Sequence, residues 1–247
     1  IASLARAVAD DVDQAWGAVQ HSERPRIHVF LSSSEIHQMH QLRKNREEVM
    51  EMAVRSVERA KSYCSDIEFS PMDATRTNKE YLFQMLEEVL RAGATTINIA
   101  DTVGYAIPSS GDFVKLLNDV QEKVAGIDKV TLSVHCHNDL GLAVANSLAA
   151  VIAGAGQVEG CINGIGERAG NASLEEIIMA LDTRNDFFGV EMSIDTTQIY
   201  PASRMVSRVT GMAVQSNKAI VGENAFRHAS GIHQDGVLKN RSTYEVM

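Results

Sequence analysis

Short apolar segments alternate with amphipathic helical segments through most of this chain, at a repeat of about 30 residues. Strands are predicted where β-branched and apolar residues form short runs, at 1–4, 27–31, 67–70, 96–100, 131–135 and 157–162. Helices are predicted where apolar residues recur three and four positions apart, at 8–19, 46–63, 78–92, 110–124, 142–153 and 174–181. Such regular alternation predicts an α/β fold with a parallel sheet, either doubly wound or closed into a barrel.

Local signals at two helix ends support this division. Gly93 follows the helix predicted at 78–92, in the position where a glycine with a positive φ ends many helices. Ser173 precedes the helix predicted at 174–181 and is followed three residues later by Glu176, which is the pattern of a capping box. Both helices therefore have predicted ends that agree with their hydrophobic periodicity.

The βα pattern stops at about residue 182. A helix is predicted from Asp195 towards Gly211, and a second helical piece around 224–230. We therefore expect two domains, a sheet domain over 1–193 and a small helical subdomain over 194–247. The chain opens abruptly inside an apolar segment without a recognisable signal peptide, which suggests a piece of a longer protein.

The composition narrows the classes of protein to consider. A net charge of -9 and an isoelectric point of about 5.4 argue against a nucleic-acid-binding surface. No apolar stretch approaches the roughly 18 residues that a membrane helix needs. The three cysteines, Cys64, Cys136 and Cys161, form no C-x-x-C pair, which favours reduced thiols and a cytoplasmic location.

A His-x-His sequence closes the strand predicted at 131–135. His135 and His137 flank Cys136, and because side chains alternate along a strand, both imidazoles are expected on one face and the thiol on the other. Two imidazoles at the carboxyl end of a strand are half of a divalent-metal site. A histidine pair that is only hydrogen-bonded at a strand end is the alternative.

A glycine-rich loop at 163–171 follows the next strand along the chain. It superficially resembles a dinucleotide-binding fingerprint, but the spacing from Gly166 to Gly170 is one residue too long and no acidic ribose partner lies at the right distance. Asn171 ends the loop, where its side chain suits either a helix cap or a metal ligand that binds through the amide oxygen. The loop alone leaves both roles open.

Polar side chains also lie at other predicted strand ends and in the helical part. Asn98 and Thr102 lie at the end of one strand, where a polar turn is the alternative to a ligand site. His28 lies within another strand and is equally well explained as a buried core histidine. His233 belongs to a glycine-flanked segment at 230–236, which suits close approach to a ligand or a tight turn.

Three segments together resemble a known family. They are HCHNDLGLA at 135–143, GIGERAGNA at 164–172 and SGIHQDG at 230–236. With them the chain closely resembles the isopropylmalate synthase family, one of the acyl-CoA/2-oxo-acid condensing enzymes that share a metal-dependent TIM barrel. The first two segments mark the condensing enzymes broadly, and the third favours isopropylmalate synthases and their close relatives.

The resemblance implies a fold, a reaction and a set of partners. The fold would be a TIM (β/α)8 barrel, of which this chain carries strands three to eight only, followed by the helical subdomain. The reaction would be a Claisen condensation of acetyl-CoA with 3-methyl-2-oxobutanoate in leucine biosynthesis. A divalent metal, Mg²⁺, Mn²⁺ or Zn²⁺, would polarise the ketone. The resemblance further implies a homodimer with exchanged subdomains, without nucleic acid or membrane.

The resemblance also assigns binding roles to individual residues. The metal ligands would be His135, His137 and Asn171. The 2-oxo acid would be bound by His28, Ser70, Asn98 and Thr102. Of these, Thr102 matches the family residue that binds the substrate carboxylate.

The remaining roles concern acetyl-CoA. His233 and Tyr244 match catalytic residues that the helical subdomain delivers, and His233 would assist removal of a proton from the acetyl methyl group. Gly164 and Gly166 would let the acyl-CoA pass close to the backbone.

Three features depart from the family pattern. Two βα units and a fourth metal ligand, an aspartate of the first barrel strand, have no counterpart here, so this chain alone is expected to be inactive. Met72 stands where the family typically has a glutamate near the acetyl group, and a thioether cannot accept the proton. Ala100 stands where many relatives have proline, which is expected to loosen that loop.

These departures keep alternatives open. Methylthioalkylmalate, citramalate and homocitrate synthases are close rivals, distinguished by pocket residues that the sequence does not place. Met72 motivates a different interpretation, a catalytically impaired relative that still binds metal and oxo acid. A lyase that runs the reverse cleavage is disfavoured, because Cys161 lies in a strand pattern and not in a glycine-flanked loop.

Overall fold

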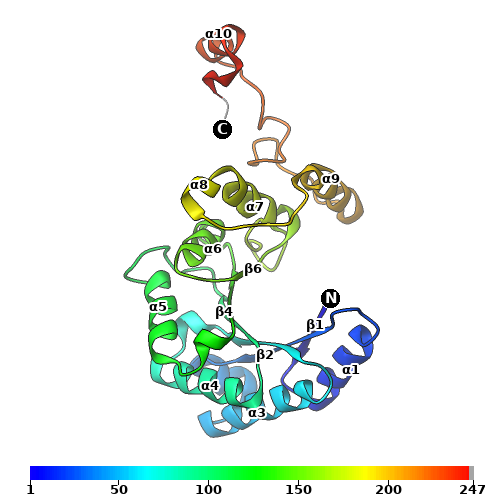
Figure 1. Ribbon diagram of the computed structural model, residues 1–247, viewed down its shortest axis with the longest axis vertical. Helices are drawn as coiled ribbons and strands as arrows, with labels where there is room; N and C mark the ends of the chain where they lie inside the picture. The colour runs from blue at the N-terminus through cyan, green and yellow to red at the C-terminus, as the bar shows by residue number, and fades with distance from the viewer. Residues whose placement is uncertain (245–247) are drawn as a thin grey trace. The chain divides into compact units, whose positions relative to one another are not determined.

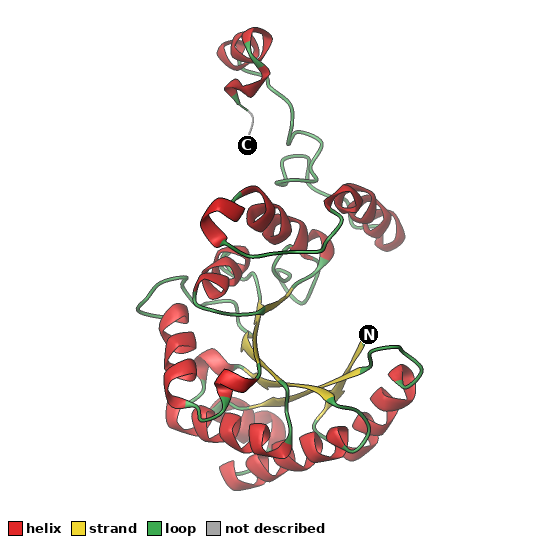
Figure 2. Ribbon diagram, viewed as in Figure 1, coloured by secondary structure: helices red, strands yellow, loops and turns green. Residues whose placement is uncertain are grey.

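The computed structural model describes residues 1–244, which contain a sheet of six parallel strands (Figure 1). The strands are β1 Ala2–Arg6, β2 Arg26–Ser32, β3 Asp66–Met72, β4 Thr96–Asp101, β5 Thr131–Cys136 and β6 Gln157–Glu159. They pair in the order of the sequence, from β1 to β6. A doubly wound sheet would reverse its strand order at a switch point, so this order supports the barrel alternative. Figure 2 shows the sheet curled like half of a barrel.

Helices connect successive strands of this sheet. The long ones are α1 Ala9–Val19, α3 Arg46–Lys61, α4 Lys79–Ala92, α5 Phe113–Lys123 and α6 Ala143–Ile152. Shorter turns are α2 Glu35–His37, the π-helical η1 Gln38–Leu42, and the 3-10 turns η2 Ala74–Arg76 and η3 Ile127–Lys129. Figure 1 shows α1, α3, α4 and α5 on the convex side of the sheet. The predicted strands and long helices are therefore confirmed, with small shifts at most ends. The strand predicted at 157–162 ends at Glu159, so the placement of Cys161 in a strand is wrong: it forms an isolated bridge with Ser173 and directly precedes η4.

The sheet has an apolar and a polar face, because residue types alternate along the strands from β2 to β6. The apolar residues are buried beneath the helices: Ile27, Val29, Ile67, Phe69, Ile97, Ile99, Leu132 and Val134. The polar residues lie on the concave side: Arg26, His28, Glu68, Ser70, Asn98, Ser133, His135, Gln157 and Glu159. The core thus lies between sheet and helices, and the concave face carries the polar groups from which a site can be built.

The curl of the sheet brings distant strands together. Arg26 of β2 donates a hydrogen bond from Nη1 to Oε1 of Gln157 in β6, at 2.6 Å. These two strands are four positions apart in the sheet. Four strand spacings of a flat sheet would separate them by about 19 Å. The concave face is therefore strongly curved, as in the wall of a barrel.

The two predicted helix ends have different outcomes. Gly93 ends α4 with a φ of 115°, as predicted. The capping box predicted at Ser173 is wrong, because this residue is the N-cap of α7 Leu174–Thr183 but its side chain makes no capping bond. The Lys218 ammonium instead donates to Ser173 Oγ at 2.8 Å and to Glu176 Oε1 at 2.6 Å. A charged donor binds these acceptors more strongly than a backbone amide does.

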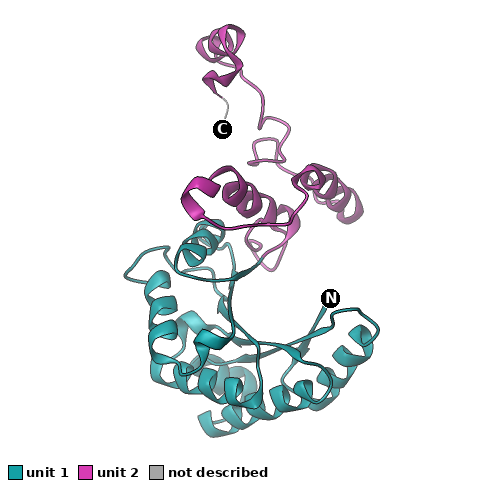
Figure 3. Cartoon of the chain, in the orientation of Figure 1, with its two compact units in different colours: residues 1–159 teal, residues 160–247 magenta. Residues whose placement is uncertain are grey.

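The chain divides into two compact units, 1–159 and 160–247 (Figure 3). The second unit contains α7, α8 Asn185–Phe188, α9 Ile199–Thr210, α10 Gly231–Lys239, η4 Ile162–Gly164, η5 Thr196–Gln198 and η6 Arg241–Thr243. The helix predicted before Gly211 is confirmed, whereas 224–230 form turns and the next helix begins only at Gly231. The boundary expected near residue 193 falls inside the second unit, and the division into barrel and subdomain stays a prediction. Within the part of the chain that the structure describes, no helix has the length and apolar character needed to cross a membrane.

Candidate active site

Glu159 is the centre of a cluster on the concave face of the sheet. Its Oε2 accepts a hydrogen bond from Asn98 Nδ2 at 3.0 Å and lies 3.3 Å from His135 Nδ1. Its Oε1 lies 3.4 Å from His28 Nδ1. The strand register places Glu159 of β6 directly beside His135 of β5. This carboxylate therefore connects side chains from three other strands.

Three predicted pocket residues lie together beside Glu159. His28 Nε2 is 2.6 Å from Ser70 Oγ, which also accepts a hydrogen bond from Asn98 Nδ2 at 2.9 Å. All three side chains are buried. Asn98 Oδ1 is also buried and accepts no hydrogen bond from the described residues, so it is an acceptor that a polar ligand can satisfy. The structure thus brings these residues together, while their binding role stays a prediction.

Burial and charge shift the pKa values in this cluster. Burial and the charge of Glu159 raise the pKa of Glu68 to about 7, against the opposing effect of Arg26. Burial by itself would raise the pKa of Glu159, but the hydrogen bond to His135 and the charges of His28 and His135 hold it below its usual range. Burial lowers the pKa of His28. These shifts favour a neutral His28 imidazole beside an ionised Glu159 at neutral pH.

His28, Glu68 and Glu159 have ligand atoms within 4.8 Å of one another, a spacing that can hold a cation. Both oxygens of Glu68 are already bonded, however. Oε2 accepts from Arg26 Nη1 at 2.9 Å, and Oε1 accepts from Gln157 Nε2 at 2.8 Å. A guanidinium at that distance opposes a second positive charge. We therefore assign no metal to this group.

His135 and His137 converge at the carboxyl end of β5. Their Nε2 atoms are 3.2 Å apart, and their rings lie nearly perpendicular. Two metal–nitrogen bonds of about 2.1 Å that meet at about 100° span that same separation. The pair therefore fits adjacent coordination of one divalent ion. Cys136 lies between them in the sequence but belongs to the opposite face of the strand, where it is fully buried and burial raises the pKa of its thiol to about 12.

Thr102 is joined to the loop after β3. The backbone N–H of Asp73 donates to Thr102 Oγ1 at 2.8 Å. Asp73 is fully buried with a φ of 66°, a strained conformation for a residue with a side chain. Ion pairs hold it there, because its carboxylate accepts from Arg76 Nε at 2.8 Å and lies 3.1 Å from His37 Nδ1. Met72, which precedes Asp73, lies at the same carboxyl edge of the sheet as Thr102.

Asn171 belongs to the second unit and is held by a tight glycine loop. It is 7% exposed, and its Oδ1 accepts from Cys161 Sγ at 3.6 Å. A Cβ at Gly166 would lie 1.8 Å from Asn171 Oδ1, and a Cβ at Gly164 would lie 2.8 Å from Ser173 Oγ. These glycines therefore have a packing role inside the loop, and their predicted contact with acyl-CoA stays a prediction. Because Ser173 is the N-cap of α7, Asn171 is not the helix cap, and its role as a metal ligand stays a prediction.

His233 and Tyr244 lie together in the second unit. Their ring centroids are 4.4 Å apart. A third aromatic side chain, His228, lies 5.5 Å from the Tyr244 ring and 6.2 Å from that of His233. The structure thus groups the two predicted catalytic residues, and their catalytic role stays a prediction.

Sequence motifs give no functional role to four polar residues of this face, Glu159, Glu68, Arg26 and Gln157. Glu68, Gln157 and Glu159 lie within predicted strands and Arg26 directly precedes one, and none of them belongs to a recognisable motif. The available signal was charge: a glutamate or arginine in the middle of a predicted buried strand needs a partner. Only the curl of the sheet shows that Arg26, Glu68 and Gln157 bond to one another, and that Glu159 bonds to Asn98 and lies beside two histidines.

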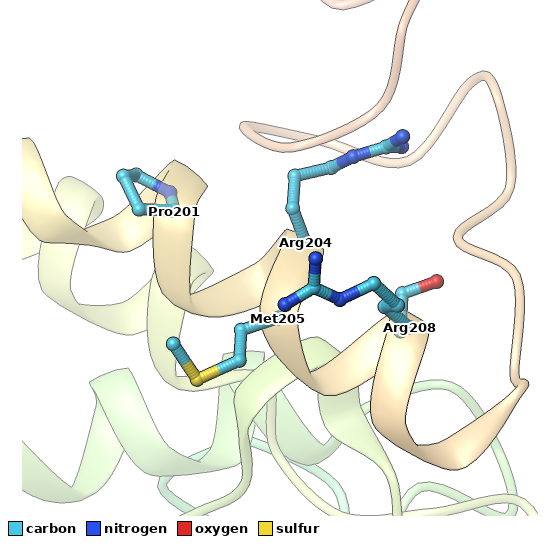
Figure 4. A pocket seen from close by; sticks show the side chains of 5 residues that line it. Pro201, Arg204, Met205 and Arg208 are labelled. Atoms are coloured by element: carbon cyan, nitrogen blue, oxygen red, sulfur yellow. The ribbon is translucent and has the colours of Figure 1, made fainter.

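A surface hollow of about 450 Å³ lies elsewhere, on α9 (Figure 4). It is lined by Pro201, Arg204, Met205, Ser207 and Arg208, which all come from that helix. This lining has two arginines but no carboxylate, histidine or cysteine, so it offers neither metal ligands nor a general base.

Two family descriptions match the chain. Residues 1–206 match the family described as HMGL-like, and residues 220–247 match homocitrate synthase post-HMGL domain-like. Proteins named 2-isopropylmalate synthase are 60% identical in Ruminiclostridium cellulolyticum and 58% identical in Pelotomaculum thermopropionicum and Syntrophus aciditrophicus, over 247 residues. Each comparison covers 100% of this chain and 48% of the relative. The chain therefore spans about half the length of these relatives.

Several solved structures with a similar fold are HMG-CoA lyases. One is an HMG-CoA lyase from Acinetobacter baumannii in complex with coenzyme A and 3-methylmalate, with a TM-score of 0.73 and 21% identity, covering 93% of this chain and 74% of that one. Another is the lyase from Pseudomonas aeruginosa, with a TM-score of 0.71 and 18% identity, covering 86% and 70%. At such identities the likeness shows the fold alone. Since the family match extends over residues 1–206, the chain belongs to the HMGL-like family.

Proposed function

We propose that this chain is the catalytic part of a 2-isopropylmalate synthase, which condenses acetyl-CoA with 3-methyl-2-oxobutanoate. The observation that carries the proposal is the convergence of His135 and His137, with Nε2 atoms 3.2 Å apart, beside a buried polar cluster. The choice of substrate is supported by relatives of that name at 54–60% identity along the whole chain. The proposed fold of the whole protein is a TIM (β/α)8 barrel in which β1 to β6 are strands three to eight.

In this proposal the metal ligands are His135, His137 and Asn171. A divalent ion bound there would supply Lewis-acid polarisation of the ketone. His135 and His137 present their Nε2 atoms to one point, and the glycine loop holds the Asn171 side chain in place. Mg²⁺, Mn²⁺ and Zn²⁺ all accept such nitrogen and oxygen donors.

The 2-oxo acid is proposed to bind beside this point. His28, Ser70 and Asn98 form one hydrogen-bonded group, and the free acceptor Asn98 Oδ1 is available to a substrate or to water. Thr102, whose Oγ1 accepts from the Asp73 N–H, is proposed to bind the carboxylate. An ordered hydroxyl positions a small anion more strictly than a mobile one does.

Proton removal from the acetyl methyl group is assigned to His233, with Tyr244 beside it. Imidazole titrates near neutral pH, which suits a general base. The centroid of the Tyr244 ring lies 4.4 Å from that of the His233 imidazole. The cytoplasmic location and the homodimer with exchanged subdomains are also part of this proposal.

The test is release of CoA thiol from acetyl-CoA by the full-length protein, with a panel of 2-oxo acids. We expect the fastest release with 3-methyl-2-oxobutanoate, and loss of it in His135→Ala. Faster release with pyruvate or 2-oxoglutarate would instead indicate a citramalate or homocitrate synthase. Cleavage of a carbon–carbon bond in a 3-hydroxyacyl-CoA, with formation of acetyl-CoA and no release of thiol, would instead indicate a lyase.

A second candidate function follows from Met72. Its sulfur lies 3.9 Å from Ser32 Oγ and supplies no acid or base at this edge of the sheet. A catalytically impaired relative would bind metal and 2-oxo acid but release no thiol with any acceptor. Restoration of thiol release in Met72→Glu would then locate the defect at this position.

A further inference from the structure

We propose that Glu159 is a positioning residue that orients His135 towards the metal and links this ligand to the 2-oxo-acid pocket. This inference rests on the proposed function. The two ring nitrogens of His135 face different partners. Nε2 is directed at His137 Nε2, 3.2 Å away, whereas Nδ1 lies 3.3 Å from Glu159 Oε2.

The chemistry of imidazole explains why this arrangement matters. A neutral imidazole has one N–H and one lone pair, and a carboxylate next to Nδ1 keeps the proton there. Nε2 then presents its lone pair to the cation. The carboxylate also makes the imidazole a stronger base and therefore a better ligand. The side chain of Glu159 thus selects the tautomer that a metal at Nε2 requires.

Glu159 is itself held in place by pocket residues. Asn98 Nδ2 donates to Oε2 at 3.0 Å, and His28 Nδ1 lies 3.4 Å from Oε1. Ser70 connects these two, through contacts of 2.6 Å to His28 and 2.9 Å to Asn98. A shift of any member of this ring therefore moves the carboxylate that orients His135. Metal binding and the shape of the pocket are coupled through this one side chain.

The experiment compares metal binding by variants of the full-length protein. Metal-free protein is titrated with Co²⁺ by calorimetry, and the visible absorption of the bound ion is recorded. Glu159→Gln keeps the shape of the side chain but removes its charge, and we expect affinity to fall roughly 10- to 100-fold with a shifted Co²⁺ spectrum.

Glu68→Gln is the matched control. Glu68 is buried on the same polar face, but its oxygens bond to Arg26 and Gln157 and not to His135. Because Glu68 also interacts with the charge of Glu159, we expect a small change in Co²⁺ affinity, well below that of Glu159→Gln, and an unchanged spectrum. Equal loss in both variants would mean that any disturbance of the polar face weakens the site, and would overturn the specific role of Glu159.

Wild-type affinity and spectrum in Glu159→Gln would also overturn the inference. If that variant does not fold, Glu159→Asp provides the test, because it keeps the charge but withdraws the carboxylate from Nδ1. It too should bind Co²⁺ more weakly, and wild-type binding would contradict the role. Failure of the proposed function has a different signature, since then the wild-type protein would bind no Co²⁺ or bind it equally well in His135→Ala.

Discussion

At the scale of single residues, Gly166 illustrates how a motif glycine serves its neighbour. A Cβ at this position would lie 1.8 Å from Asn171 Oδ1, a distance that no packed structure tolerates. Gly166 does not have a positive φ, so a glycine is needed here for space and not for its backbone conformation. The glycine therefore makes room for the amide oxygen that we propose as a metal ligand.

This requirement leads to a prediction for Gly166→Ala. We expect displacement of Asn171, a loss of about 1–3 kcal/mol in the free energy of unfolding, and weaker Co²⁺ binding by the full-length protein. Gly17→Ala is the control, because nothing lies within 4 Å of a Cβ there and alanine favours the helix α1. Unfolding in urea and calorimetry measure the two effects. A Gly166→Ala variant with native metal affinity would contradict the proposed role of Asn171.

Glu68 makes a second prediction at this scale, about pH. Its pKa is raised from 4.5 to about 7, so the folded protein retains a proton that the unfolded chain has already lost between these values. Stability therefore falls as pH rises through this window, by at most about 3 kcal/mol from this group. In Glu68→Gln this loss is absent. The difference in unfolding free energy between wild type and variant should change in favour of the variant from about pH 5 to about pH 8. A constant difference would show that Glu68 is ionised throughout.

At the scale of elements, helix ends show which local signals survive tertiary contacts. Asn45 and Glu48 form a complete capping box at the start of α3, with both hydrogen bonds at 2.9 Å. Ser173 and Glu176 have the matching pattern at α7 but bind Lys218 instead. The exposed start of α3 therefore has its predicted cap. At the partly buried start of α7, the ammonium of Lys218 binds the side chains that would form the cap.

The cap of α3 gives the prediction at this scale. Asn45→Ala removes the acceptor for the Glu48 N–H, and we expect a loss of about 1 kcal/mol in unfolding free energy. Ser230→Ala is the comparison, since Ser230 also precedes a helix but its side chain makes no capping bond. It should leave stability nearly unchanged. The measurement is urea unfolding of both variants and of the wild type. Equal losses of unfolding free energy in the two variants would contradict the capping role of Asn45.

At the scale of the whole molecule, the curled sheet carries charges on its concave side. Arg26 of β2 binds Asp66 at 2.9 Å, Glu68 at 2.9 Å and Gln157 at 2.6 Å. Glu68 is almost completely buried, so it depends on this guanidinium for compensation. The Arg26 side chain thus connects β2 to β3 and β6 through hydrogen bonds.

The corresponding prediction concerns removal of the Arg26 guanidinium. Arg26→Met leaves Glu68 buried without its cation and raises the pKa of Glu68 further, so we expect a loss in unfolding free energy that grows as pH rises above neutral, to roughly 3 kcal/mol. The double variant Arg26→Met/Glu68→Gln should recover part of that loss, because no charge is left unpaired. Urea unfolding of the single and double variants is the measurement. No recovery would show that Arg26 acts through packing and not through its charge.

The sequence was informative wherever the cause of a structure was local. Strands and helices followed from residue periodicity, and the faces of His135, Cys136 and His137 followed from alternation along a strand. The role of Glu159 was not visible, because its partners come from strands 24 to 131 residues away and meet only when the sheet curls. The cap at Ser173 failed for the same reason, since Lys218 is 45 residues away.

The contact between Arg26 and Gln157 has a consequence for folding. It forms only when β3, β4 and β5 lie between the two strands in the correct register, because the distance is otherwise too long for the two side chains. A slip of one residue in any of these strands would turn apolar side chains inward and leave the arginine facing them. The contact therefore stabilises the sheet only in its native register.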